Sequence, residues 1–265
     1  MRPEAGSAAA VPAADDAARD AVVPAVVVDD LHVTYRVYED VRPTLRRLVA
    51  RRFRPRPHVE VRALQGVSFT AMPGEAVGVI GRNGSGKSTL MSALAGLLPA
   101  ERGSVHAASQ PVLLAVGAAL QGDLSGRRNI MIGGSALGVP RAELAAQMDG
   151  IIEFTGLREA IDRPLRTYSS GMAARLQFGI ASAVRPDILL IDEALATGDA
   201  EFQRRSEARI AEIVAGAGTV FVVSHAADVM ARMTRRSIWI DAGRIVFDGP
   251  TEQALEEYAR ATAAG

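Results

Sequence analysis

The chain has 265 residues, of which 48% are hydrophobic and 23% are charged, so it can bury a sizeable core and is neither disordered nor collagen-like. Thirty basic residues balance thirty acidic ones, which removes any general electrostatic attraction to nucleic acid. The absence of Cys excludes disulfides, thiolate catalysis and cysteine-bound metal centres, and it fits a reducing compartment.

The N-terminal part of the chain has two segments that we do not assign to strands or helices. Residues 1–24 are rich in Ala, Pro and Asp and lack the apolar segment of a signal peptide, so we expect a flexible tail. Residues 42–56 contain seven Arg and no acidic residue. This basic segment is either a solvated loop or a surface that contacts a membrane partner or anionic lipid headgroups.

The remaining sequence alternates short β-branched runs with longer amphipathic stretches. Strands are predicted at 26–35, 59–71, 75–80, 104–106, 112–116, 188–191 and 219–223, with a final hairpin of 237–241 and 244–248. Helices are predicted at 87–97, over most of 127–184 with breaks at 138–140 and 163–164, and at 201–214, 226–233 and 251–261. This order predicts an α/β domain over 25–265 with an inserted helical block. No run of about 18 apolar residues, the length that crosses a bilayer, occurs in it.

A glycine-rich segment separates the predicted strand at 75–80 from the helix that follows. Residues 81–88 read Gly-Arg-Asn-Gly-Ser-Gly-Lys-Ser and fit the phosphate-binding pattern GxxxxGK[ST]. In such a loop, backbone N–H groups at a helix N-terminus surround phosphate oxygens, the Lys reaches the β- and γ-phosphates, and the Ser hydroxyl binds Mg²⁺. The candidate ATP-binding residues are Gly81, Asn83, Gly84, Ser85, Gly86, Lys87, Ser88 and Thr89, with Ser88 also a metal ligand.

Lys87 strengthens the prediction of a nucleotide site over a simple anion-binding turn. It is the only Lys among thirty basic residues, and it stands where a planar guanidinium would fit badly. The motif therefore predicts ATP as ligand and Mg²⁺ as its metal.

Two carboxylates follow the apolar strand at 188–191. Asp192 can hold Mg²⁺ through water, opposite Ser88, and Glu193 can orient or deprotonate an attacking water. A positioned base of this kind contributes on the order of 10²–10⁴-fold to a rate. The alternative is a polar pair at an ordinary strand end, but the glycine-rich loop earlier in the chain favours the catalytic interpretation.

A second short motif, Tyr-Ser-Ser-Gly-Met at 168–172, precedes a predicted amphipathic helix and by itself indicates only a helix cap. This motif lies between the glycine-rich loop and the strand that ends before Asp192. With the three motifs in this order, residues 26–250 resemble the ATP-binding subunits of ABC transporters, and residues 168–172 correspond to their LSGGQ signature. The resemblance implies a P-loop NTPase fold: a mostly parallel sheet flanked by helices, an antiparallel β part, and a helical subdomain at about 117–176.

The resemblance also implies roles for three single residues. Tyr35 would stack on adenine, although Tyr38 competes for that role and a core position for Tyr35 is the other alternative. His225 would hydrogen-bond the γ-phosphate and hold Glu193 and the water, where a lone His is otherwise structural. Asp199 would either belong to the D-loop at the ATP site or cap the helix that follows.

Further implications concern the assembly. In this family the signature of one subunit covers ATP held by the other, so Ser169 and Gly171 would contact the γ-phosphate in a head-to-tail homodimer. The family's Q-loop Gln is missing near 116–117, and Gln121 lies a few residues later, which leaves its role open.

Within the family, segments 124–130, 168–176 and 192–203 and the Tyr-Arg-Val-Tyr at 35–38 are similar to exporters of O-antigen, teichoic acid and galactan. We therefore expect an ATPase that powers export of a lipid-linked polysaccharide through a separate transmembrane permease, on the cytoplasmic side of the cell membrane. The chain stops at Gly265, so we expect no carbohydrate-binding C-terminal domain. The alternatives are another ABC importer or exporter and an ABC ATPase acting on nucleic acid.

Overall fold

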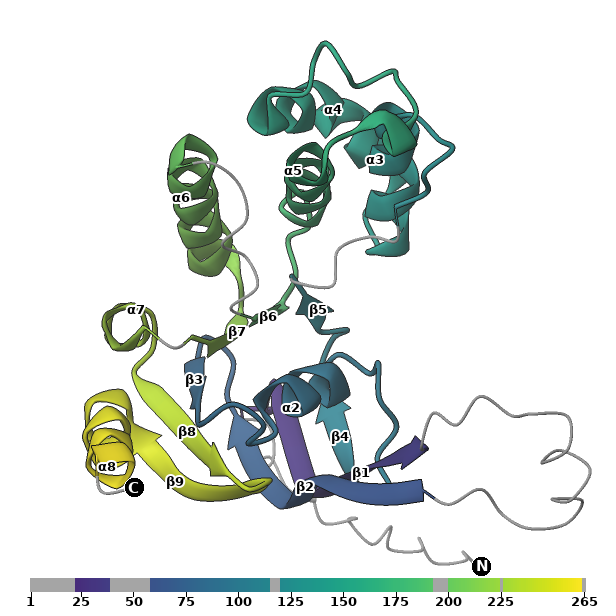
Figure 1. Cartoon of the computed structure of the whole chain (residues 1–265). Helices are drawn as coiled ribbons and strands as arrows, with labels where there is room; N and C mark the ends of the chain where they lie inside the picture. Colours follow the sequence, from purple (N-terminus) through teal and green to yellow (C-terminus); the bar gives the residue numbers. More distant parts are fainter. Residues whose placement is uncertain (1–21, 39–57, 115–119, 193–199, 225, 264–265) are drawn as a thin grey trace, which may run out of the picture.

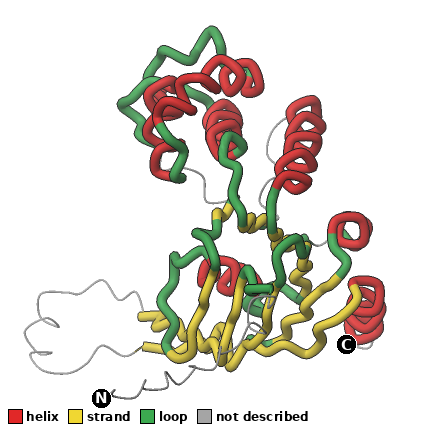
Figure 2. The backbone as a smooth tube through the Cα atoms, turned by 180° about the vertical axis from the view of Figure 1, so that it is seen from behind, coloured by secondary structure: helices red, strands yellow, loops and turns green. Residues whose placement is uncertain are grey.

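The computed structural model describes residues 22–38, 58–114, 120–192, 200–224 and 226–263. Most of the predicted tail and the whole Arg-rich segment lie outside these ranges. The strands gather in one part of the molecule together with α2, α7 and α8, and a separate group of helices, α3 to α5, stands above them (Figures 1 and 2).

Three strands form an antiparallel sheet in the order β2-β1-β4. They are β1 (Val26–Tyr38), β2 (His58–Ala71) and β4 (Arg102–Ala107). β1 pairs with β2 along its whole length, from Val26 opposite Ala71 to Tyr38 opposite His58. The predicted strand at 26–35 is therefore three residues longer than expected.

Six strands form the second sheet in the order β5-β6-β7-β3-β8-β9, which is parallel except for the terminal β8–β9 hairpin. The strands are β3 (Ala76–Ile80), β5 (Val112–Leu113), β6 (Ile188–Ile191), β7 (Thr219–Val223), β8 (Arg236–Asp241) and β9 (Arg244–Pro250). Every residue of β6 and β7 is buried, because a central parallel strand is covered on both faces and needs a continuous apolar run.

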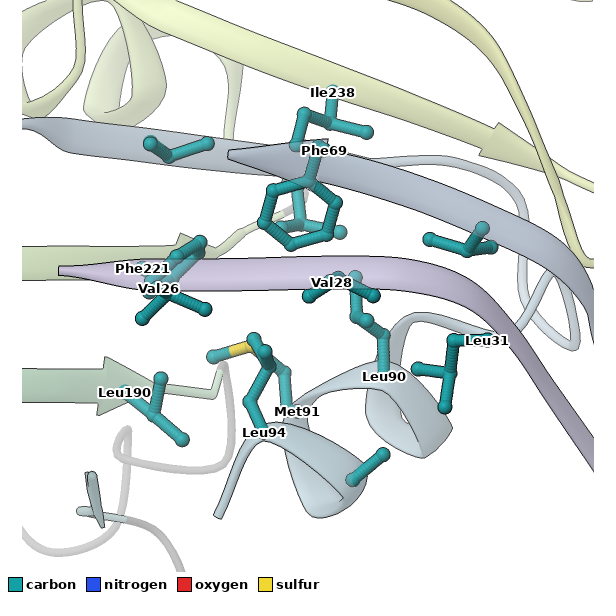
Figure 3. Packing of buried hydrophobic residues seen from close by; sticks show 14 of the residues in the cluster. Val26, Val28, Leu31, Phe69, Leu90, Met91, Leu94, Leu190, Phe221 and Ile238 are labelled. Carbon is teal, nitrogen blue, oxygen red and sulfur yellow. The ribbon is translucent and has the colours of Figure 1, made fainter. Parts of the chain in front are cut away.

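The main core lies between the two sheets and the helix α2 (Lys87–Leu94). Leu90, Met91 and Leu94 point from α2 toward Val26 and Val28 of β1 (Figure 3). Phe69 of β2 and Phe221 of β7 meet with ring centroids 5.9 Å apart. Helix α2 directly follows the glycine-rich segment. This packing therefore holds the helix, and the end of the segment, against both sheets.

The helical group consists of α3 (Gly126–Ala136), α4 (Arg141–Thr155) and α5 (Ser170–Ala181), with a short 3₁₀ turn at Leu165–Thr167. Asn129 on α3 is only 1% exposed and binds the chain before its helix: its Oδ1 accepts from Gln121 N at 2.7 Å, and its Nδ2 donates to the carbonyls of Gln121, Leu124 and Ser125. A buried amide with these bonds stabilises the start of α3.

Helix α6 (Ala200–Gly216) joins the helical group through aromatic contacts. The rings of Phe154, Phe178 and Phe202, from α4, α5 and α6, have centroids 5.6–5.9 Å apart. Arg205 adds bonds from Nη2 to the carbonyls of Glu153 and Phe154 at the end of α4. The helix that follows segment 193–199 is thus packed against the group that carries α5.

The remaining described helices are α7 (Ala227–Met233) and α8 (Thr251–Ala263). Helix α8 packs on β8 and β9, and α7 contacts β3 and α8. The predicted helix at 87–97 ends early, at Leu94, because Gly96 adopts a left-handed φ of 73° and closes the helix. The predicted strand at 112–116 is confirmed for Val112–Leu113, and residues 115–116 lie outside the described ranges.

Arg236 at the start of β8 links both sheets. It donates to Asp248 at 2.6 and 2.7 Å, to Glu75 at 3.0 Å and to the carbonyl of Thr70 at 2.8 Å. The hydrogen bond with Asp248 raises the pKa of Arg236 against the opposing effect of burial, and Glu75 raises it further.

Replacing Arg236 by Ala is expected to lower the free energy of unfolding by about 3 kcal/mol, because two half-buried carboxylates lose their partner. Urea denaturation measures the change. Arg260→Ala is the control, since Arg260 pairs with Glu256 and Glu257 on the exposed face of α8 and its loss costs about 0–1 kcal/mol. Equal losses in the two variants would contradict a special role for Arg236.

Candidate functional site

The backbone of the glycine-rich segment binds the side chain of the segment's own lysine, Lys87. Gly86 caps α2 in a left-handed conformation with φ 113°, and Lys87 begins the helix. The Lys87 ammonium is buried at 7% exposure and donates to the carbonyls of Gly81 at 2.7 Å and Arg82 at 2.9 Å. The side chain therefore lies within the loop, with the backbone of the segment curled around it.

A cavity of about 330 Å³ opens over this loop. It brings together residues from β1, β2, the loop, the end of β6 and the end of β7. Its lining is Tyr35, Val61, Arg62, Ala63, Asn83, Gly84, Gly86, Lys87, Ser88, Thr89, Asp192 and Val223. Eight of the predicted site residues thus share one cavity.

Tyr35 reaches the cavity from β1 and is 39% exposed. It pairs with Val61 across the strands, and its hydroxyl lies 3.4 Å from Thr89 Oγ1 on α2. The core position considered for Tyr35 is therefore wrong. The side chain of the competing Tyr38 is outside the described part of the structure.

Two predicted loop residues do not line this cavity. Ser85 is 4% exposed, and its Oγ has no hydrogen-bond partner among the described residues. Gly81, the first residue of the loop, is also buried and lines a smaller cavity next to α8. Both belong to the buried base of the loop, and their contact with ATP stays a prediction.

Asp192 stands at the carboxyl end of β6, half-buried in the wall of the cavity. Parallel strands β6, β7 and β3 end at the same edge of the sheet, which places Asp192 near the loop that follows β3. Ser88 and Asp192 share the cavity and offer the oxygen ligands that Mg²⁺ prefers beside phosphates. Glu193, Asp199 and His225 lie outside the described residues, so their predicted roles are untested.

The signature segment lies in the helical group. The Ser169 Oγ caps α5 by accepting from Met172 N at 3.2 Å, and the Tyr168 hydroxyl donates to the carbonyl of Ala160 at 2.7 Å. Burial raises the pKa of Tyr168. Ser169 and Gly171 line another cavity, of about 650 Å³, whose walls come from the helical group. One chain therefore holds the loop and the signature in two separate cavities. The helical group that carries the signature stands apart from the strands (Figure 1).

Gln121 is exposed, and its backbone is bound by Asn129 rather than directed to the cavity over the loop. Sequence reasoning also missed Val61, Arg62 and Ala63, which line that cavity from β2. No local pattern marks these residues. The pairing of β1 with β2 brings them to the cavity, with Val61 opposite Tyr35 and Arg62 opposite Thr34.

A model of the ABC transporter family matches residues 64–196. The chain is 42% identical over 202 residues to the O-antigen export system ATP-binding protein RfbB of Klebsiella pneumoniae, which covers 76% of this chain and 82% of that protein. The chain belongs to the ABC transporter family, and the predictions of that family and of an ATPase are confirmed.

Two further relatives are longer than the chain. It is 43% identical to RfbB of Myxococcus xanthus and 40% identical to the teichoic acids export ATP-binding protein TagH of Enterococcus faecalis. The match covers 76% and 74% of this chain but only 46% and 44% of those proteins. These names agree with the narrower resemblance to polysaccharide exporters.

A solved ATP-binding cassette confirms the predicted fold class. It is a dimer in a post-hydrolysis state with ADP and phosphate bound. The two folds superpose with a TM-score of 0.64 at 18% identity, over 85% of this chain and 98% of that one.

Proposed function

We propose that the cavity over the glycine-rich loop binds ATP. The base stacks on Tyr35 beside Val61, and the phosphates reach the loop, where backbone N–H groups and the Lys87 ammonium neutralise their charge. Ser88 and Asp192 hold Mg²⁺, which shields the phosphates and stabilises charge in the transition state. The observation that carries this proposal is the presence of all five side chains in the lining of one cavity.

For hydrolysis we assign two residues that follow strand ends at this edge of the sheet. Glu193 comes directly after Asp192 and orients the attacking water, accepting its proton. His225 comes two residues after Val223, which lines the cavity, and donates to the γ-phosphate.

The separate position of the signature supports a composite site. Because Ser169 and Gly171 line a cavity of the helical group, a second copy in head-to-tail orientation is needed to bring them to the γ-phosphate. Asp199 lies between Glu193 and α6 in the sequence and contributes to the same interface. ATP then joins two chains, and its hydrolysis lets them separate.

We propose that the dimer powers export of a lipid-linked cell-surface polysaccharide. The support is the similarity to ATP-binding proteins named for O-antigen and teichoic acid export systems. Among the described residues, no helix has the length and apolarity needed to cross a bilayer. Because the relatives are named as ATP-binding proteins of export systems, we place the translocation path in a separate permease and the chain at the cytoplasmic face of the membrane.

The domain boundaries belong to the same proposal. Residues 1–24 form a tail, and 25–265 form one ATP-binding domain whose helical part covers about 117–176. Helix α5 begins in this part and leads back toward β6, which ends at Asp192. Movement of the helical part is thus passed along a short connection to the metal ligand.

Depleting the chain from its host is expected to stop surface display of one polysaccharide and to accumulate its lipid-linked form on the cytoplasmic face. Surface labelling and extraction of the lipid fraction measure both effects. Affinity purification of the tagged chain should recover a polytopic membrane protein. Recovery of nucleic acid or ribosomes, with normal surface polysaccharide, would contradict the exporter role.

A further inference from the structure

The turn between β8 and β9 is hydrogen-bonded to the glycine-rich loop. The backbone N–H of Gly243 donates to the carbonyl of Ser85 at 2.9 Å. On its other side the turn is bound by Gln65 of β2, whose backbone N donates to Gly243 O and whose Nε2 donates to Ala242 O, both at 2.8 Å. Arg244 Nη2 lies 3.4 Å from Gln65 Oε1. The turn therefore connects β2 with the loop.

The loop and the turn also press against the same peptide group of β2. A Cβ atom on Gly86 would lie 2.5 Å from the carbonyl oxygen of Ala63, and one on Gly243 would lie 2.7 Å from it. Both glycines have positive φ, 113° and 78°. Only glycine combines this backbone conformation with such a close approach.

Strand β2 thus serves three parts of the site within five residues. Val61 lies opposite Tyr35 in the cavity wall, Ala63 contacts the loop and the turn, and Gln65 binds the turn. The Gln65 side chain is half-buried and is not part of the cavity lining. Its side chain is hydrogen-bonded to the turn, so the turn is the route by which this side chain can act on a nucleotide.

The turn requires such support because its first residue is strained. Ala242 has a φ of 45°, the left-handed region that is unfavourable for an L-residue with a Cβ. Its carbonyl accepts the Gln65 side-chain bond, which holds the peptide group in this conformation. The adjoining N–H of Gly243 is then directed at Ser85.

We propose that Gln65 is a positioning residue for nucleotide binding: it holds the Ala242–Gly243 turn, and the turn keeps the Ser85–Gly86 backbone in the phosphate-binding conformation. This inference rests on the proposed function, because it requires that the loop binds ATP. It adds a residue outside the cavity to those that determine affinity.

Replacing Gln65 by Ala in the full chain is expected to raise the Kd for Mg-ATP about ten-fold, the effect of losing one hydrogen bond that organises the loop. Isothermal titration at 10 °C, with circular dichroism to verify the fold, measures this change. Gln65→Glu keeps the acceptor for Arg244 but has no donor for Ala242 O, so it should bind Mg-ATP as weakly as Gln65→Ala. Gln147→Ala is the matched control, since that half-buried Gln on α4 donates to Glu143 and its loss should leave the Kd unchanged.

Two results would contradict either the role of Gln65 or the proposed binding of ATP by the loop. If the unaltered chain fails to bind Mg-ATP, the proposed function is wrong. If the unaltered chain binds and Gln65→Ala binds equally well, with only a lower melting temperature, Gln65 is merely structural and the inference is wrong.

A second variant tests the turn itself. Gly243→Ala places a Cβ against Ala63 O and should weaken Mg-ATP binding more than ten-fold. Gly150→Ala on α4 is its control, because a Cβ there meets nothing within 4 Å, and it should bind like the unaltered chain. Equal affinity in a folded Gly243→Ala chain would overturn the proposal, and if that variant does not fold, Gln65→Ala decides alone.

Discussion

Replacing Lys87 by Ala is expected to lower ATP hydrolysis at least about 100-fold, the usual effect of removing one donor that stabilises transition-state charge. The ammonium is the compact cation of the loop and is already held there by bonds to Gly81 O and Arg82 O. The variant loses both the charge offered to the phosphates and a group that organises the loop. Phosphate release by the purified chain, with or without its permease, measures the rate.

Lys87→Arg is expected to be almost as inactive, because a planar guanidinium cannot occupy the site of a compact ammonium. Arg232→Ala provides a control for loss of a positive charge, since Arg232 pairs with Asp228 on the surface of α7. Full activity in both Lys87 variants would contradict the assignment of the loop as the triphosphate site.

Replacing Glu193 by Gln should abolish turnover while preserving ATP binding. The amide keeps the size of the side chain but cannot accept the proton of the attacking water, so we expect a rate about 10²–10⁴-fold lower. ATP then stays bound between two chains, and the variant should form a long-lived dimer with ATP. Light scattering with and without Mg-ATP measures the mass.

The two properties of this variant test different claims. Normal hydrolysis by Glu193→Gln would contradict the role of Glu193 as base. A variant that binds ATP but stays monomeric would contradict the composite site, whatever its rate. Ser169→Arg is a companion variant, because a bulky side chain at the cap of α5 should prevent dimer formation without entering the chain's own phosphate loop.

The central strands were predictable because their burial leaves a clear pattern. Residues 188–191 and 220–223 are continuous apolar runs, and both lie in strands whose residues are all buried. The strand predicted at 26–35 is too short because Arg36 and Val37 are both exposed, and residues 36–38 extend it by pairing with β2. The early end of α2 had a local signal, Gly96, which closes the helix.

The phosphate loop and its lysine were evident from a local pattern, because the backbone of a short segment builds that site. Its surroundings depended on contacts between residues far apart in the chain. Sheet order brings Asp192 to the same edge as the loop, and strand register brings Val61 opposite Tyr35. The hydrogen bond from Gln65 to Ala242 in the β8–β9 turn also depends on a long-range contact, because the two residues are 177 positions apart in the chain.

The amino-acid sequence was sufficient to identify the nucleotide-binding class and the position of the glycine-rich loop, because this motif occupies a few consecutive residues. The three-dimensional structure was needed to establish which side chains share a cavity, that Gly81 and Ser85 are the buried residues at the base of the loop, and that the signature lines a different cavity. The reason is physical: hydrogen-bond register and packing between distant strands set these distances, and no local pattern encodes them.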